Sequence, residues 1–190
     1  MAIDPSLKSH PLYPAWMEFQ AADVAYRRMV ACGVGNFEEY ELAWRELLGR
    51  IERVWAKTEA AVMAMPGWQK VKSDVTRLRR SDPLLLYLFQ ARNVDEHSIA
   101  PLAKENDMNL QAKVTENGRV QLSWDPWDRP LLPVANRGVV YQPPRMHLGA
   151  SIAPLLGKGK AEPRVVAELG MQFYINFLNR VSTEVVRQLT

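Results

Sequence analysis

The most informative segment of this chain spans Ser81–Ile99 and reads SDPLLLYLFQARNVDEHSI. Its opening is typical of a helix N-terminus, because the side chains of Ser81 and Asp82 can cap free backbone N–H groups and Pro83 suits the first helical turn. A run of large apolar residues follows and leads directly into an arginine, an amide and a histidine. Burying such polar groups costs free energy unless they are paired or used, so this helix is where we look first for function.

A helical wheel, drawn at about 100° per residue, places Asn93 and His97 on one side of this helix, with Gln90 close by. Arg92 falls between that side and the opposite one, one turn before Glu96. Most other positions on the wheel are apolar, among them Leu84, Leu85, Leu86, Leu88, Phe89, Ile99 and Leu102. Because apolar residues surround the helix almost completely, we expect it to lie centrally in a bundle or against a partner subunit.

The bulk composition is that of a single globular domain spanning residues 1–190. Hydrophobic residues make up 47% of the chain, enough for one sizeable core, and the net charge of +3 is compatible with a nucleic-acid partner without requiring one. The single cysteine, Cys32, excludes an internal disulfide and fits a reducing compartment, so we expect a cytoplasmic protein. No apolar stretch approaches the roughly 20 residues that cross a bilayer, and we expect no membrane association.

Apolar residues recur at three and four positions along most of the chain, which is the spacing that one buried helix face requires. This periodicity predicts helices over residues 15–31, 37–64 and 82–103, a shorter helix or turn over residues 68–80, and a last long helix that Pro163 opens. Residues 1–13 form an N-terminal arm in this prediction. The helical core comprises residues 15–103 and 162–189.

A β insertion is expected at about residues 106–142, where the apolar period changes to two. A three-residue loop with Gly118 in the left-handed position pairs Val114 with Val120, Ala112 with Leu122 and Leu110 with Trp124, which keeps the apolar residues on one face. Residues 138–141 are expected as a third strand. The predicted fold class is therefore mainly α, a helical bundle with a small β-hairpin or sheet insertion between the last two long helices.

The segment RNVDEH at residues 92–97 resembles the signature of the HEPN family, in which an arginine and a polar residue precede a histidine by four to six residues. The family consists of small helical-bundle proteins and includes many ribonucleases of toxin–antitoxin and phage-defence systems. Here Asn93 is the polar residue and four residues separate Arg92 from His97. The resemblance covers this helix and its helical context, about half of the chain, and leaves the β insertion unexplained.

This resemblance implies a metal-independent endoribonuclease without cofactors, in which Arg92, Asn93 and His97 are catalytic. Imidazole titrates near neutrality, so His97 can move protons, and the guanidinium of Arg92 suits phosphate oxygens. Asn93 orients the ring or bonds the substrate. The family pairs two motifs across a dimer cleft, so the resemblance also implies a homodimer, RNA as substrate, and an antitoxin or regulatory protein as partner.

A structural interpretation stands beside the catalytic one. Arg92 can pair with Glu96 one turn away, and His97 can be a core histidine stabilised near the end of its helix. The alternative function is a non-catalytic helical dimerisation or partner-binding module with the same fold. The sequence alone leaves open whether the protein is an enzyme.

Two further sets of residues are candidates for the site. A basic run just upstream of the motif helix can receive an RNA backbone or can be a solvated helix face; it consists of Lys70, Lys72, Arg77, Arg79 and Arg80. His147 is either a second active-site group supplied by the insertion or a turn residue. The chain has no His-Glu-x-x-His or Cys-x-x-Cys spacing, and we expect no dedicated metal site.

Overall fold

The computed structural model describes residues 8–32, 36–97, 102–103, 111–114, 120–123, 131–155 and 161–186, without the side chains of residues 95–97, 111–114 and 120–123. The described helices are α1 (Tyr13–Ala31), α2 (Phe37–Val62), α3 (Trp68–Ser81), α4 (Pro83–His97) and α5 (Pro163–Val181), which continues into a π-helical turn, η4 (Ser182–Val186). The strands are β1 (Gln111–Val114), β2 (Val120–Ser123), β3 (Val134–Asn136), β4 (Val139–Tyr141), β5 (Met146–His147) and β6 (Ala150–Ser151). A short 3-10 helix, η2 (Ala153–Leu155), follows. The prediction of a mainly helical bundle with small antiparallel sheets before its last helix is confirmed.

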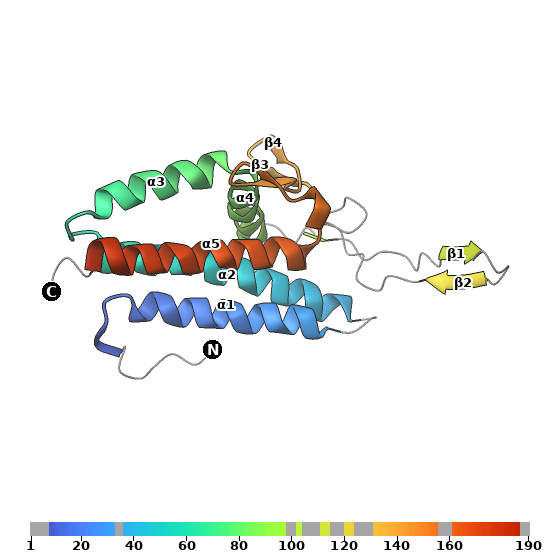
Figure 1. The fold of residues 1–190 in the computed structure, drawn as a ribbon, viewed down its shortest axis with the longest axis horizontal. Coiled ribbons are helices and arrows are strands. Elements are labelled where there is room, and N and C mark those ends of the chain that lie inside the picture. The colour runs from blue at the N-terminus through green and yellow to red at the C-terminus, as the bar shows by residue number, and fades with distance from the viewer. Residues whose placement is uncertain are drawn as a thin grey trace.

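Helices α1, α2 and α5 lie side by side along one direction, whereas α4 is turned away from that direction (Figure 1). Ion pairs join α1 to α2: Arg28 donates to Glu39 at 2.6 and 2.9 Å and to Glu46 at 2.6 Å. Farther along the same seam, Glu18 accepts from Arg50 at 3.1 Å. These pairs set the register of two helices whose facing sides are otherwise apolar.

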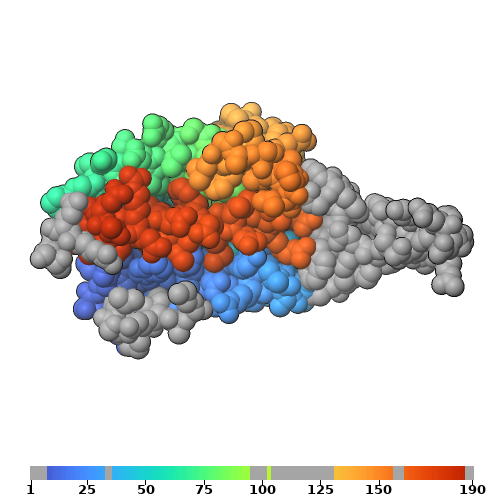
Figure 2. Space-filling view, in the orientation of Figure 1, coloured from blue at the N-terminus to red at the C-terminus, as the bar shows by residue number. Residues whose placement is uncertain are grey.

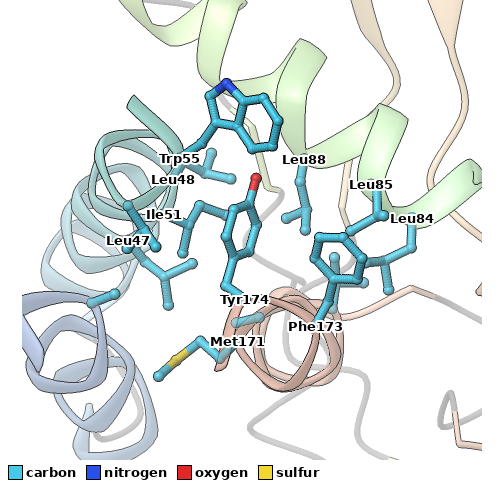
Figure 3. Packing of buried hydrophobic residues seen from close by; sticks show 14 of the residues in the cluster. Leu47, Leu48, Ile51, Trp55, Leu84, Leu85, Leu88, Met171, Phe173 and Tyr174 are labelled. Carbon is cyan, nitrogen blue, oxygen red and sulfur yellow. The ribbon is translucent and has the colours of Figure 1, made fainter. Parts of the chain in front are cut away.

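The core gathers around Tyr174, with α2, α4 and α5 each supplying large side chains (Figure 3). Trp55 stacks on Phe177 with ring centroids 5.4 Å apart and contacts Trp68 at 5.9 Å. Burial raises the pKa of Tyr174 to about 12, so its hydroxyl stays neutral at physiological pH. The structure therefore encloses this aromatic cluster in one continuous hydrophobic core.

Helix α4 is central, as its sequence predicted. It contacts α2, α3, α5, β3 and β5. Five of its residues have exposed fractions of 2% or less: Leu84, Leu85, Tyr87, Leu88 and Ala91. The Tyr87 hydroxyl donates to the carbonyl of Leu132 at 2.6 Å, which ties the helix to the chain leading into β3.

The prediction that this helix continues to residue 103 is wrong. Leu102 and Ala103 are buried but not helical: the Leu102 N–H donates to Glu41 at 2.9 Å, and Ala103 forms an antiparallel bridge with Leu131. Helical spacing of apolar residues indicates that a residue is buried. A buried residue in an extended segment can fit the same spacing. The proline at position 101 is the sequence signal for a break, because it lacks an N–H and disfavours helix before it.

The predicted hairpin register is confirmed, with Val114 opposite Val120 and Ala112 opposite Leu122. The pairing of Leu110 with Trp124 and the loop at Gly118 lie outside the described residues. The predicted strand at residues 138–141 exists as β4, but it pairs with β3 instead of extending the first hairpin. A further hairpin, β5–β6, lies beyond the predicted end of the insertion at residue 142.

The β3–β4 and β5–β6 hairpins are built alike. Each has a two-residue loop of a larger residue followed by glycine, Arg137-Gly138 and Leu148-Gly149, with positive φ at both positions, as in type I′ turns. Figure 2 shows the segment that contains them, residues 131–155, gathered in one orange body, and its strands β3 and β5 contact α4. The hairpins thus form one side of the surface around α4.

Candidate functional site

The N-terminus of α4 is anchored by Asp82, whose side chain is 2% exposed. Asp82 Oδ1 accepts from the N–H groups of Leu84 and Leu85 at 3.0 Å each, which caps the helix. The same carboxylate contacts His147 Nδ1 at 3.2 Å and accepts from the Leu148 N–H. Burial opposes ionisation of Asp82, but the hydrogen bonds from His147, Leu148 and Leu85 outweigh it and lower its pKa.

His147 is therefore placed at the opposite end of α4 from the motif. Its ring contacts Asp82, while His97 is the last residue of the helix that the structure describes. At 1.5 Å per residue, these two ends are about 22 Å apart along the axis. The structure brings His147 to the cap of α4 and not to Arg92 and Asn93.

A groove with a volume of about 530 Å³ runs between the C-terminal half of α4 and the β3–β4 hairpin. It is lined by polar and apolar side chains: Phe89, Gln90, Asn93, Asn136, Arg137, Val139 and Tyr141. Amide, guanidinium and phenol groups meet in this groove beside α4. We take it as the candidate site and call it the α4 groove.

Asn93 connects the α4 groove to the sequence motif. It lines the groove, and its Oδ1 accepts from Arg92 Nη1 at 3.2 Å. His97 follows Asn93 by one helical turn, on the same side of the helix. The predicted trio is thus confined to one end of α4, while the His97 side chain and the expected pairing of Arg92 with Glu96 lie outside the described residues.

A second hollow of about 340 Å³ adjoins the α4 groove on the side of α3. It is lined by Thr76, Arg79, Arg80, Leu86, Phe89 and Gln90, so the two hollows share Phe89 and Gln90. The two hollows therefore lie next to each other on α4, one toward the C-terminal end of α3 and the other toward the β3–β4 turn. Arginine side chains line both hollows: Arg79 and Arg80 line the second hollow and Arg137 lines the α4 groove.

The basic residues of α3 do not form one free cationic face. Lys72 pairs with Glu59 at 2.5 Å and Arg77 with Asp74 at 3.6 Å, while Lys70 and Arg80 are exposed. Only two members of the predicted run, Arg79 and Arg80, reach the second hollow. The assignment of the whole run to substrate binding stays a prediction.

Arg79 has a structural environment that its sequence context did not indicate. Its side chain is only 12% exposed and pairs with Glu52. The guanidinium lies 4.7 Å from the ring centroid of Trp55 and 5.2 Å from that of Phe89. Cation–π contacts of this kind hold an arginine firmly against aromatic rings, so Arg79 fixes Phe89 at the wall shared by the two hollows.

Sequence reasoning missed the groove residues supplied by the insertion: Asn136, Arg137, Val139 and Tyr141. The signal that marks their turn is a glycine after a polar pair, Asn136-Arg137-Gly138, between two short apolar runs. That signal predicts a hairpin, but it does not say that the hairpin packs beside Gln90.

Other features of the described residues add no second site. Cys32 is buried, as expected for a small core residue. No group of three His, Cys, Asp or Glu side chains in the described ranges could hold a metal ion. Among the helices of the described chain, none is long and apolar enough to span a membrane.

Comparison with protein-family models, with curated proteins and with solved structures found no match to this chain.

Proposed function

We propose that this protein is a metal-independent endoribonuclease of the HEPN type, acting at the C-terminal end of α4. The observation that supports the proposal most is the position of Asn93: it binds Arg92 at 3.2 Å and also lines the α4 groove. One residue of the motif, Asn93, therefore lies in a groove that also carries Arg137 and the amides of Gln90 and Asn136. A polyanion with exposed bases, such as single-stranded RNA, suits that combination of arginines, amides and aromatic rings.

The proposed reaction is attack by a ribose 2′-hydroxyl on the adjacent phosphorus. His97 takes the proton from the 2′-oxygen or gives one to the leaving 5′-oxygen, and the Arg92 guanidinium stabilises the charge that develops on the phosphate. The O–P bond to the 5′-oxygen breaks as the 2′-oxygen bond forms. The products are a 2′,3′-cyclic phosphate and a 5′-hydroxyl end, with no change in oxidation state.

A homodimer belongs to the same proposal, because one histidine cannot be both base and acid in one step. Leu86 and Phe89 are only half-buried, and both line the second hollow on the side of α4 that faces α3. A second copy on this side would bring two sets of Arg92 and His97 together. A cytoplasmic location, a toxin or defence role, and an antitoxin or regulatory partner are likewise proposals that follow from the family resemblance.

The test is RNA cleavage in EDTA by purified wild type, His97→Ala and Arg92→Ala. We expect wild type alone to cut mixed cellular RNA and to leave 2′,3′-cyclic phosphate ends, with each variant at least about a hundredfold slower. The matched control is Arg27→Ala, which removes an arginine that is 66% exposed and paired to Asp23 on α1. Equal cleavage by His97→Ala and wild type, at equal melting temperature, would refute the assignment.

A second candidate function is the non-catalytic partner-binding module, which one observation favours. The segment 131–155 exposes several large apolar side chains: Val139, Val140, Met146, Leu148 and Leu155, with exposed fractions between 44% and 59%. Exposed apolar groups gathered in one segment are typical of interaction surfaces. This function predicts no RNA cleavage, with the effect of Arg92→Ala confined to stability or assembly.

A further inference from the structure

The α4 groove contains groups that the cleavage chemistry does not use. Gln90 is 8% exposed, and its Oε1 accepts from Asn136 Nδ2 at 2.7 Å, which joins α4 to β3. This is the only hydrogen bond formed by either side chain among the described residues. One donor and one acceptor are thereby satisfied, which leaves the Gln90 N–H groups and the Asn136 carbonyl oxygen without a hydrogen-bond partner among the described residues of a groove that both side chains line.

A donor next to an acceptor is the pattern that pairs with the edge of a nucleobase. Each unpaired base presents such a complementary pair on its Watson–Crick edge, whereas a base in a duplex has that edge occupied. The groove also has aromatic walls, Phe89 and Tyr141, on which a base can stack. The amide pair and these walls together suit one unstacked, unpaired base.

Arg137 supplies the cation that a nucleotide needs next to its base. It lines the groove from the first position of the β3–β4 turn, with a φ of 49°. Asparagine and glycine occupy that left-handed region far more readily than arginine does, so the turn alone does not account for this side chain. The β5–β6 turn places Leu148 at the same φ of 49°, and Leu148 is not among the residues that line the groove.

We propose that the α4 groove binds one unpaired nucleotide of single-stranded RNA. The base edge bonds to the amide pair of Gln90 and Asn136, the ring stacks between aromatic walls, and the phosphate is held by Arg137. This inference rests on the proposed function in taking RNA as the ligand. It adds that the protein selects single strands over duplexes and that these residues, not the catalytic motif, provide the selection.

The test is RNA binding by full-length protein carrying His97→Ala, so that the RNA stays intact. Fluorescence anisotropy compares a short single-stranded oligoribonucleotide with a blunt duplex of the same sequence. We expect the single strand to bind at least about tenfold more tightly, and Gln90→Met, which keeps the side-chain volume, to remove about tenfold of that affinity. Arg137→Asn is expected to weaken binding about tenfold while raising the melting temperature, because asparagine suits the turn.

Two matched controls are available in the chain. Leu148→Asn places asparagine at the equivalent position of the β5–β6 turn. It is expected to raise the melting temperature without altering RNA binding. Gln172→Met disrupts an exposed amide pair on α5, in which Gln172 donates to Asn176 at 3.1 Å, and is expected to leave binding unchanged.

The outcomes separate this inference from the proposed function. Equal binding of single strand and duplex, no binding of either, or unchanged binding by both Gln90→Met and Arg137→Asn would overturn the nucleotide site. RNA cleavage by wild type in that case would still support the proposed ribonuclease function. Selective single-strand binding that depends on Gln90 and Arg137, in a protein that cuts no RNA, would support the nucleotide site in the α4 groove and refute the proposed ribonuclease function.

Discussion

Asp82 shows how one side chain can determine where two elements meet. The sequence identified it as a helix cap, and the structure confirms that role through its bonds to Leu84 and Leu85. The same carboxylate also holds His147 and Leu148 of the β5–β6 hairpin. A charged acceptor with several donors is worth more than a neutral one, and it is costly to leave those donors unpaired in a buried place.

We therefore expect Asp82→Ala to lower the free energy of unfolding by about 3 kcal/mol at neutral pH, measured by urea denaturation. The pKa of Asp82 is lowered by folding, so its contribution is present above the ordinary carboxyl pKa, near 4, and is lost as the pH falls below that value. The difference between wild type and variant should accordingly shrink between about pH 4 and pH 2. If the difference in free energy of unfolding stays constant over this range, the stabilising role of the ionised Asp82 carboxylate is contradicted.

At the scale of elements, α4 and α5 pack closely together at Gly170. A Cβ atom there would lie 2.7 Å from Leu88 Cδ1, inside the contact distance, and Leu88 is itself 2% exposed. Gly49 on α2 provides the contrast, because the nearest atom to its Cβ would be in the exposed guanidinium of Arg53, at the ordinary contact distance of 3.9 Å. Close packing leaves no room for a side chain at Gly170, whereas the packing around Gly49 leaves room for one.

Gly170→Ala is expected to destabilise the protein by about 1–2 kcal/mol, since overpacking outweighs the gain in helix propensity. Gly49→Ala is expected to stabilise it by about 0.5–1 kcal/mol, because propensity acts there without a clash. Thermal and urea unfolding measure both. Adding Leu88→Val to Gly170→Ala should cost less than the sum of the single changes, and simple additivity would argue against close packing at this crossing.

At the scale of the whole molecule, backbone pairing joins the two segments that flank residues 104–130. Ala103 bridges Leu131, and the Leu132 N–H donates to the carbonyl of Leu102 at 3.0 Å. The N–H of Leu131 donates to Ala161 at 2.7 Å, just before α5. The two flanks are therefore held together inside the helical body, independently of what connects them.

Replacing residues 104–130 by Asn-Gly should retain the fold, because a two-residue turn suits bridge partners such as Ala103 and Leu131. A shorter connection has a smaller entropic cost of loop closure, so we expect a melting temperature equal to or above that of wild type. Circular dichroism and thermal melting test this. Leu131→Ala, which empties a buried position in the flank, should instead lower stability. Loss of cooperative melting in the deletion alone would show that the segment is needed for folding.

Much of this architecture follows from local sequence. The helices at residues 15–31, 37–64 and 68–80 match α1, α2 and α3 closely, and Pro163 begins α5. The pairing of Val114 with Val120 could be derived from the apolar alternation alone. Such features are predictable because helix and strand periods, caps and turns depend on residues close together in the chain.

The tertiary structure alone determined which distant residues share a site. Gln90 meets Asn136, 46 positions away, and Asp82 meets His147, 65 positions away. Arg79, expected on a free basic face, lies against Trp55 and Phe89 and pairs with Glu52. The sequence by itself determined that α4 would be a buried helix with polar groups at its end. It could not supply the partners of those groups, because a periodic pattern specifies which face is buried and not what covers it.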